Sequence, residues 1–183
     1  MSGIVRRLIL RLADAGLLAP LWTERIGDEW RRNAARIWQI PPERLLHEWQ
    51  AMQARVPAAD RGDTLAFEAG LHYSDPKDWH VIAAARAAQA QGMQDVRIAT
   101  WNLKDFNRSE LRRMQLAALD PDRLLAECWA RDRQACWQAL QGVAQDAVDL
   151  GGTAQPLGDA LRRERLFRLS NLAASPQAGA GPD

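Results

Sequence analysis

The chain has 183 residues, which is enough for one domain or for one domain with a helical appendage. Its 24 basic side chains nearly balance its 23 acidic ones, so there is no strong overall field for nucleic acid or a membrane, and any RNA-binding patch must be local. Cys128 and Cys136 stand eight residues apart, too far for a routine disulfide, and neither belongs to a zinc-type cluster. These features favour a cytoplasmic protein with reduced thiols.

The N-terminal stretch 1–19 is apolar but interrupted by charge. Arg6, Arg7 and Arg11 fall within it at a spacing that predicts an amphipathic helix ending at Gly16. The same charges exclude a signal peptide or a membrane span, and we expect no membrane partner.

Two helices are predicted next. After an irregular apolar stretch over 17–22, Thr23 is a good N-cap for a helix reaching about Gln39, and a further helix covers 43–55. Residues 56–73 have little periodicity and form a connection. Three tryptophans in these helices are expected to pack in the interior, namely Trp30, Trp38 and Trp49.

The stretch from Ser74 to Phe106 carries the chemistry. Asp75 and Pro76 predict a helix start that places Asp78 in its first turn, and Gly92 ends that helix. A short apolar strand is predicted over 96–100, as in a parallel sheet.

Polar side chains gather where this strand ends. Asn102 and Asp105 follow the strand, and ligands in open parallel sheets bind beyond the carboxyl ends of the strands. With Asp78 opening on the same edge, the oxygen atoms suit a hard cation such as Mg²⁺ or Mn²⁺. A purely structural role is the alternative: Asp75 as a cap, Asp78 facing the helix dipole and Asp105 as a turn former.

The remainder of the chain is predicted to be mostly helical. A strand is expected within 114–119, followed by helices over 122–131, 132–149 and 157–169. Residues 170–183 are rich in Ala, Gly, Pro and Ser and are expected to be disordered.

Four segments together resemble the PIN-domain proteins. They are residues 8–17, 22–33, 75–81 and 100–106, and they occur in the family's order. The chain is more closely similar to the VapC-like toxin components of toxin–antitoxin systems, whose helical C-terminal extension resembles the helices after Asp120.

The resemblance implies an α/β fold of three layers, α/β/α, with a parallel sheet. It implies a PIN-like domain over 1–119, a helical extension over 120–170 and a disordered tail over 171–183. It also implies a metal-dependent ribonuclease in which Mg²⁺ or Mn²⁺ is held by four residues, Glu29, Asp78, Asn102 and Asp105. Glu29, Asp78 and Asp105 would be the catalytic carboxylates. For Glu29, a surface pair with Arg25 or Arg32 is the structural alternative.

The sequence departs from the family pattern at its beginning. PIN domains open with a strand that ends in a metal-binding Asp, whereas this chain begins where the first helix begins. Two explanations stay open: a start codon placed too late, or a truncated and inactive remnant.

Two functions follow from these observations. The leading one is a VapC-like endoribonuclease that cleaves RNA and is restrained by a cognate antitoxin. The alternative is a non-catalytic module that binds an antitoxin or a second copy of the chain. The side chains of Arg162, Arg163, Arg165 and Arg168 offer a local basic stripe.

Overall fold

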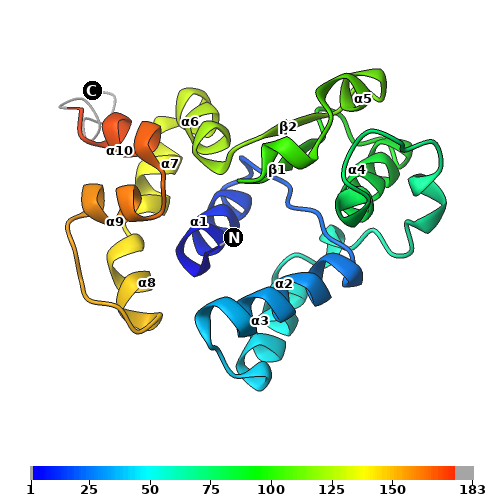
Figure 1. Ribbon diagram of the computed structural model, residues 1–183. Helices are drawn as coiled ribbons and strands as arrows, with labels where there is room; N and C mark the ends of the chain where they lie inside the picture. The colour runs from blue at the N-terminus through cyan, green and yellow to red at the C-terminus, as the bar shows by residue number, and fades with distance from the viewer. Residues whose placement is uncertain (1, 176–183) are drawn as a thin grey trace. The chain divides into compact units, whose positions relative to one another are not determined.

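The computed structural model describes residues 2–175, which are 64% helical with one small parallel sheet (Figure 1). The helices are α1 (Gly3–Asp14), α2 (Glu24–Trp38), α3 (Pro42–Arg55), α4 (Trp79–Ala90), α5 (Arg108–Arg113), α6 (Pro121–Arg131), α7 (Arg133–Leu140), α8 (Val143–Asp149), α9 (Leu157–Arg163) and α10 (Phe167–Ala173). The strands β1 (Arg97–Ala99) and β2 (Ala117–Leu119) pair with each other. The predicted mixed α/β class is confirmed.

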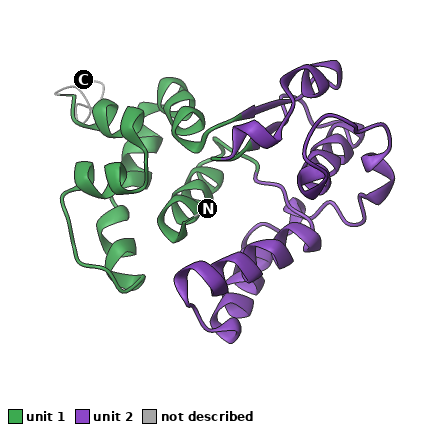
Figure 2. Cartoon of the chain, in the orientation of Figure 1, with its two compact units in different colours: residues 1–19, 99–101, 119–183 green, residues 20–98, 102–118 purple. Residues whose placement is uncertain are grey.

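Contacts divide the chain into two compact units, drawn in different colours in Figure 2. Unit 1 comprises residues 1–19, 99–101 and 119–183, and unit 2 comprises residues 20–98 and 102–118. Helix α1 therefore groups with the C-terminal helices. The predicted domain boundary after residue 119 stays a prediction.

The main core of unit 2 forms between helix α4 and strand β1. Ile82, Ala85 and Ala88 lie on one face of α4, as their spacing predicts, and pack with Ile98 and Phe106. This packing fixes the beginning of α4 beside the turn that follows β1, where the predicted site residues lie.

A second cluster in unit 2 is built from tryptophans. The ring centroids of Trp22 and Trp49 lie 5.6 Å apart, and the ring centroid of Trp30 lies 6.4 Å from that of Trp49. A Cβ atom on Gly27 would overlap the Trp49 ring, so glycine lets α2 and α3 approach closely.

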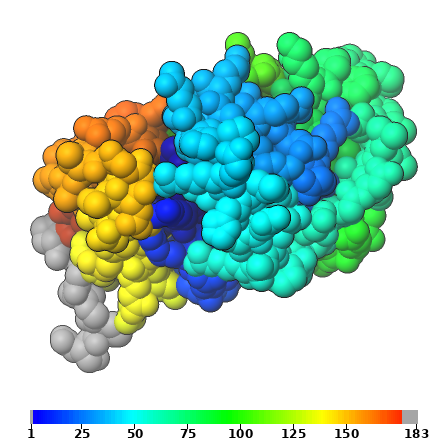
Figure 3. Space-filling view, turned by 90° about the horizontal axis from the view of Figure 1, so that it is seen from below, coloured from blue at the N-terminus to red at the C-terminus, as the bar shows by residue number. Residues whose placement is uncertain are grey.

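Trp38, predicted to pack inside, is exposed at the end of α2, because the left-handed Gln39 and then Pro41 end this helix beyond the core. The α2 and α3 surface faces the viewer in Figure 3, coloured blue to cyan.

Unit 1 packs α1 against the C-terminal helices. Val5, Leu8 and Leu12 are buried in a cluster that also contains both cysteines, and burial raises the pKa of Cys136 to about 12. The neutral thiol is therefore the stable form. Nearby, Arg7 and Arg11 form ion pairs with the buried Asp146 at 3.2 and 2.5 Å.

Two long helices predicted in this unit are each broken in the structure. The helix predicted over 132–149 divides into α7 and α8 at Gln141 and Gly142. The Arg11 guanidinium packs against Gly142, where a Cβ would meet it at 2.5 Å, so glycine permits this approach. The same guanidinium donates to the carbonyls of Ala139 and Gly142, near the end of α7.

The helix predicted over 157–169 divides at Arg165. This residue has a φ of 64°, and the Leu166 N–H donates to the Leu161 carbonyl at 2.9 Å, which closes α9. Helix α10 then runs to Ala173, so residues 170–173 of the predicted disordered tail are helical. Residues 176–183 lie outside the described residues.

None of the helices within residues 2–175 combines the length and the apolar character that crossing a bilayer requires.

Candidate metal centre

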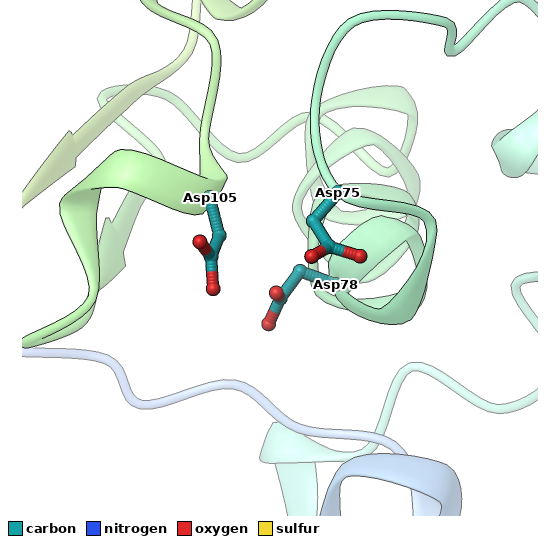
Figure 4. Close-up of side chains that lie close together, drawn as sticks. All are labelled: Asp75, Asp78 and Asp105. Atoms are coloured by element: carbon teal, nitrogen blue, oxygen red, sulfur yellow. The ribbon is translucent and has the colours of Figure 1, made fainter.

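Three aspartates in unit 2 converge from two turns. Asp75 caps and Asp78 ends the 3₁₀ turn η3 (Pro76–Asp78), and Asp105 ends the 3₁₀ turn η4 (Leu103–Asp105). One carboxylate oxygen of each lies within 4.8 Å of the others. Figure 4 shows the three side chains reaching toward one another. Three half-buried carboxylates so close together provide hard oxygen atoms for a divalent cation.

The local sequence accounts for the pair on η3. The Asp75 side chain accepts a hydrogen bond from the Lys77 N–H at 3.0 Å, and Pro76 needs no partner at the first position of the turn. In a 3₁₀ turn, side chains three residues apart lie on the same side. Asp75 therefore stands beside Asp78 at the entrance to α4.

A dense set of hydrogen bonds ties the two turns together. The Asp75 N–H donates to the Asp105 carbonyl at 2.8 Å, and the Asn107 N–H donates to the Ser74 hydroxyl at 2.9 Å. The buried Glu110 carboxylate accepts from the N–H groups of His72, Tyr73 and Ser74 at 2.7, 3.0 and 2.8 Å. These bonds hold the segment before η3 against the segment after η4.

Glu110 is ionised because of these bonds. Burial by itself would raise the pKa of this carboxyl, but the hydrogen bonds from Ser74, His72 and Tyr73 outweigh burial and lower the pKa to about 2. The negative charge of Glu110 therefore has a structural role: it holds the backbone of residues 72–74, which leads into the turn that carries Asp75 and Asp78.

Charge crowding has the opposite effect on Asp78. Burial and the negative charges of Asp105, Glu29 and Asp75 raise the pKa of Asp78 to about 6, and only Lys77 opposes them. A bound cation would relieve this repulsion. The residues present therefore fit a divalent metal ion.

The predicted residue Glu29, on α2, lies outside the group of three aspartates and contacts His80 and Asn33. Its Oε2 lies 3.0 Å from Nε2 of His80, and its Oε1 lies 3.4 Å from the Asn33 amide. The surface pair considered for Glu29 does not form, since Arg25 pairs with Glu68 at 2.6 Å and Arg32 donates to the Asp28 carbonyl. Glu29 is instead close enough to Asp78 for its negative charge to raise the pKa of that carboxyl.

The predicted residue Asn102 contacts Asp105, one of the three clustered aspartates. Its amide donates a hydrogen bond to Asp105 Oδ2, three residues later in the same turn. The structure thus places Asn102 in contact with Asp105 and Glu29 near Asp78, whereas the close carboxylate cluster consists of Asp75, Asp78 and Asp105. The roles of the four predicted residues as ligands stay a prediction.

Sequence reasoning missed three members of this neighbourhood. Asp75 was interpreted only as a cap, although its spacing of three from Asp78 was a usable signal. No sequence motif around His80 indicates a role at this site. Glu110 stands three residues after Asn107, the pattern of a capping box, but its carboxylate reaches a distant segment instead.

In comparisons with family models, with curated proteins and with solved structures, nothing matches this chain. The geometry and the sequence motifs therefore carry the functional argument.

Proposed function

We propose that this protein is a metal-dependent endoribonuclease with a PIN-like fold, acting as the toxin component of a VapBC-like toxin–antitoxin system. The observation that supports it best is the convergence of Asp75, Asp78 and Asp105 within 4.8 Å, with Glu29 close enough to raise the pKa of Asp78. The proposal includes a three-layer α/β/α arrangement and a cytoplasmic location. Its partners are an RNA substrate and a cognate antitoxin, or a second copy of the chain.

Each residue has a role that its position supports. Asp78, Asp105 and Glu29 would hold Mg²⁺ or Mn²⁺, Asp75 adds a further carboxylate, and Asn102 orients Asp105 through its amide. When bound, the ion would activate a water molecule and stabilise the leaving oxygen of a phosphodiester. The carboxylates keep the site anionic, so that RNA is repelled unless a cation is bound.

The decisive experiment measures Mn²⁺ binding by calorimetry and cleavage of a mixed RNA pool with and without EDTA. We expect Mn²⁺ to bind and EDTA to stop cleavage. Absence of Mn²⁺ binding beyond weak surface association would contradict the metal site. Binding without cleavage would instead favour the non-catalytic module that recognises an antitoxin or another copy.

The only two lysines of the chain stand beside the cluster in sequence. Lys77 precedes Asp78 and Lys104 precedes Asp105, and both are exposed, while every other basic side chain except the histidines is an arginine. We expect both ammonium groups to bind RNA phosphates next to the metal, because a charge-assisted contact contributes about 1.5–3 kcal/mol.

Replacing either lysine by Gln should therefore raise KM roughly tenfold or more with a smaller change in kcat. Arg44→Gln, on the exposed face of α3, is the control and should leave KM unchanged. Amine-selective acetylation mapped by mass spectrometry gives a second measurement, since bound RNA should protect both lysines. Full acetylation with unchanged KM would disprove their contact with RNA.

A further inference from the structure

A buried histidine follows Asp78 closely in the sequence and lies next to Glu29. His80 is in the first turn of α4, two residues after Asp78, and its side chain is 4% exposed. Neither ring nitrogen has a hydrogen bond of standard geometry within residues 2–175. Buried polar groups are almost always hydrogen-bonded, so an imidazole left in this state needs an explanation.

The structure offers two candidate partners for the ring, the backbone of Lys77 and the carboxylate of Glu29. Nε2 of His80 lies 3.0 Å from Oε2 of Glu29, a distance at which a small rotation of either side chain gives an N–H···O bond. The other oxygen of Glu29 faces the Asn33 amide at 3.4 Å. The carboxylate is therefore flanked on both sides by side-chain donors.

Glu29 needs such support for two reasons. Its side chain is 43% exposed and has three rotatable bonds, so an unsupported carboxylate would turn toward water. It also carries the same charge as Asp75, Asp78 and Asp105, which repel it. A donor on the buried side of Glu29 opposes both tendencies.

We propose that His80 is a positioning residue whose Nε2 holds the Glu29 carboxylate beside Asp78, so that helix α2 supplies a fourth acidic group to the metal centre. The inference rests on the proposed metal site and adds to it the group that joins α2 to the beginning of α4. Replacing a group that orients a metal ligand typically weakens metal affinity by about 10–100-fold.

The experiment compares Mn²⁺ affinity by calorimetry in the whole chain and in four variants, His80→Phe, His80→Gln, Glu29→Gln and the double variant His80→Phe/Glu29→Gln. We expect His80→Phe to lose about tenfold in affinity and His80→Gln, which keeps an N–H donor, to lose less. In the Glu29→Gln background, His80→Phe should cause no further loss. The matched control is His47→Gln, because His47 is an exposed histidine on α3.

A second measurement needs no metal. The ¹⁵N chemical shifts of the His80 ring should change on Glu29→Gln, whereas those of His47 should not. Unchanged shifts, full affinity of His80→Phe, or a loss that simply adds to that of Glu29→Gln would overturn the role of His80. If the unaltered chain binds no Mn²⁺, the proposed function fails and this inference fails with it, whereas normal Mn²⁺ binding with an inert His80 defeats the inference alone.

Discussion

Asp78→Asn is expected to abolish metal-dependent RNA cleavage and, at the same time, to stabilise the folded protein at pH 7. Asp78 is the carboxylate on which the charges of Asp105, Glu29 and Asp75 act, so its loss removes a central ligand position. The electrostatic contribution of a catalytic metal is several kcal/mol, and we expect cleavage to fall by about 1000-fold or more.

The gain in stability follows from the pKa. Asp78 has a pKa of about 6 in the folded protein against an ordinary value of 3.8, so the folded state binds this proton more tightly than the unfolded chain does. The native protein therefore loses stability as the pH rises from about 4 through 6. The neutral amide of the Asp78→Asn variant avoids this loss, which we place at about 1–2 kcal/mol because Asp78 is partly open to solvent.

Denaturant unfolding at pH 7 and at pH 4, with Mn²⁺ removed, measures this effect. The variant should be the more stable protein at pH 7 and equal to the unaltered chain at pH 4, where Asp78 is protonated. Asp63→Asn is the control, because Asp63 is exposed in the same unit and the Asn side chain keeps the oxygen that accepts from the Leu65 N–H at 2.9 Å. It should change neither cleavage nor stability appreciably. A stable Asp78→Asn variant with normal cleavage would remove Asp78 from the active site.

Glu110→Gln is expected to destabilise unit 2 by about 3 kcal/mol at pH 7. The carboxylate accepts three backbone hydrogen bonds in a buried position, and the Gln amide would turn an NH₂ group toward at least one of these donors. Because these bonds fix the segment that leads into Asp75, Mn²⁺ affinity should fall as well.

The pH dependence identifies the cause. The folded-state pKa of Glu110 is lowered from 4.5 to about 2, so its contribution is fully present above about pH 4.5 and is lost as the pH falls toward 2. The difference in unfolding free energy between the two proteins should therefore shrink in acid. Glu127→Gln, which weakens an i,i+4 ion pair with Arg123 on α6, should cost less than about 0.5 kcal/mol. A difference for Glu110→Gln that stays constant down to pH 3 would contradict an ionic role.

Much of the local structure was predictable because local rules govern it. Thr23 caps a helix and Asp75 caps a turn as their sequence context predicted, and the side chain of each accepts a backbone N–H. The mixed α/β class and the two short strands followed from apolar patterning in the same way.

The breaks in the C-terminal helices were not predictable from local rules. At Gly142 the break coincides with a contact to Arg11, from the beginning of the chain, whose guanidinium packs against the glycine and donates to its carbonyl. Arg165 adopts a left-handed conformation that a sequence signals only when the residue is Gly or Asn.

The sequence by itself determined part of the candidate site. Asp78, Asn102 and Asp105 stand at the ends of elements whose starts and stops are encoded by neighbouring residues, so their types and spacing were sufficient to group these three residues. Only the tertiary structure decided how they are held. Glu110 stabilises segments more than 30 residues away, and His80 meets Glu29 from another helix, because hydrogen bonding and charge depend on distance in space and leave no periodic signal in the chain.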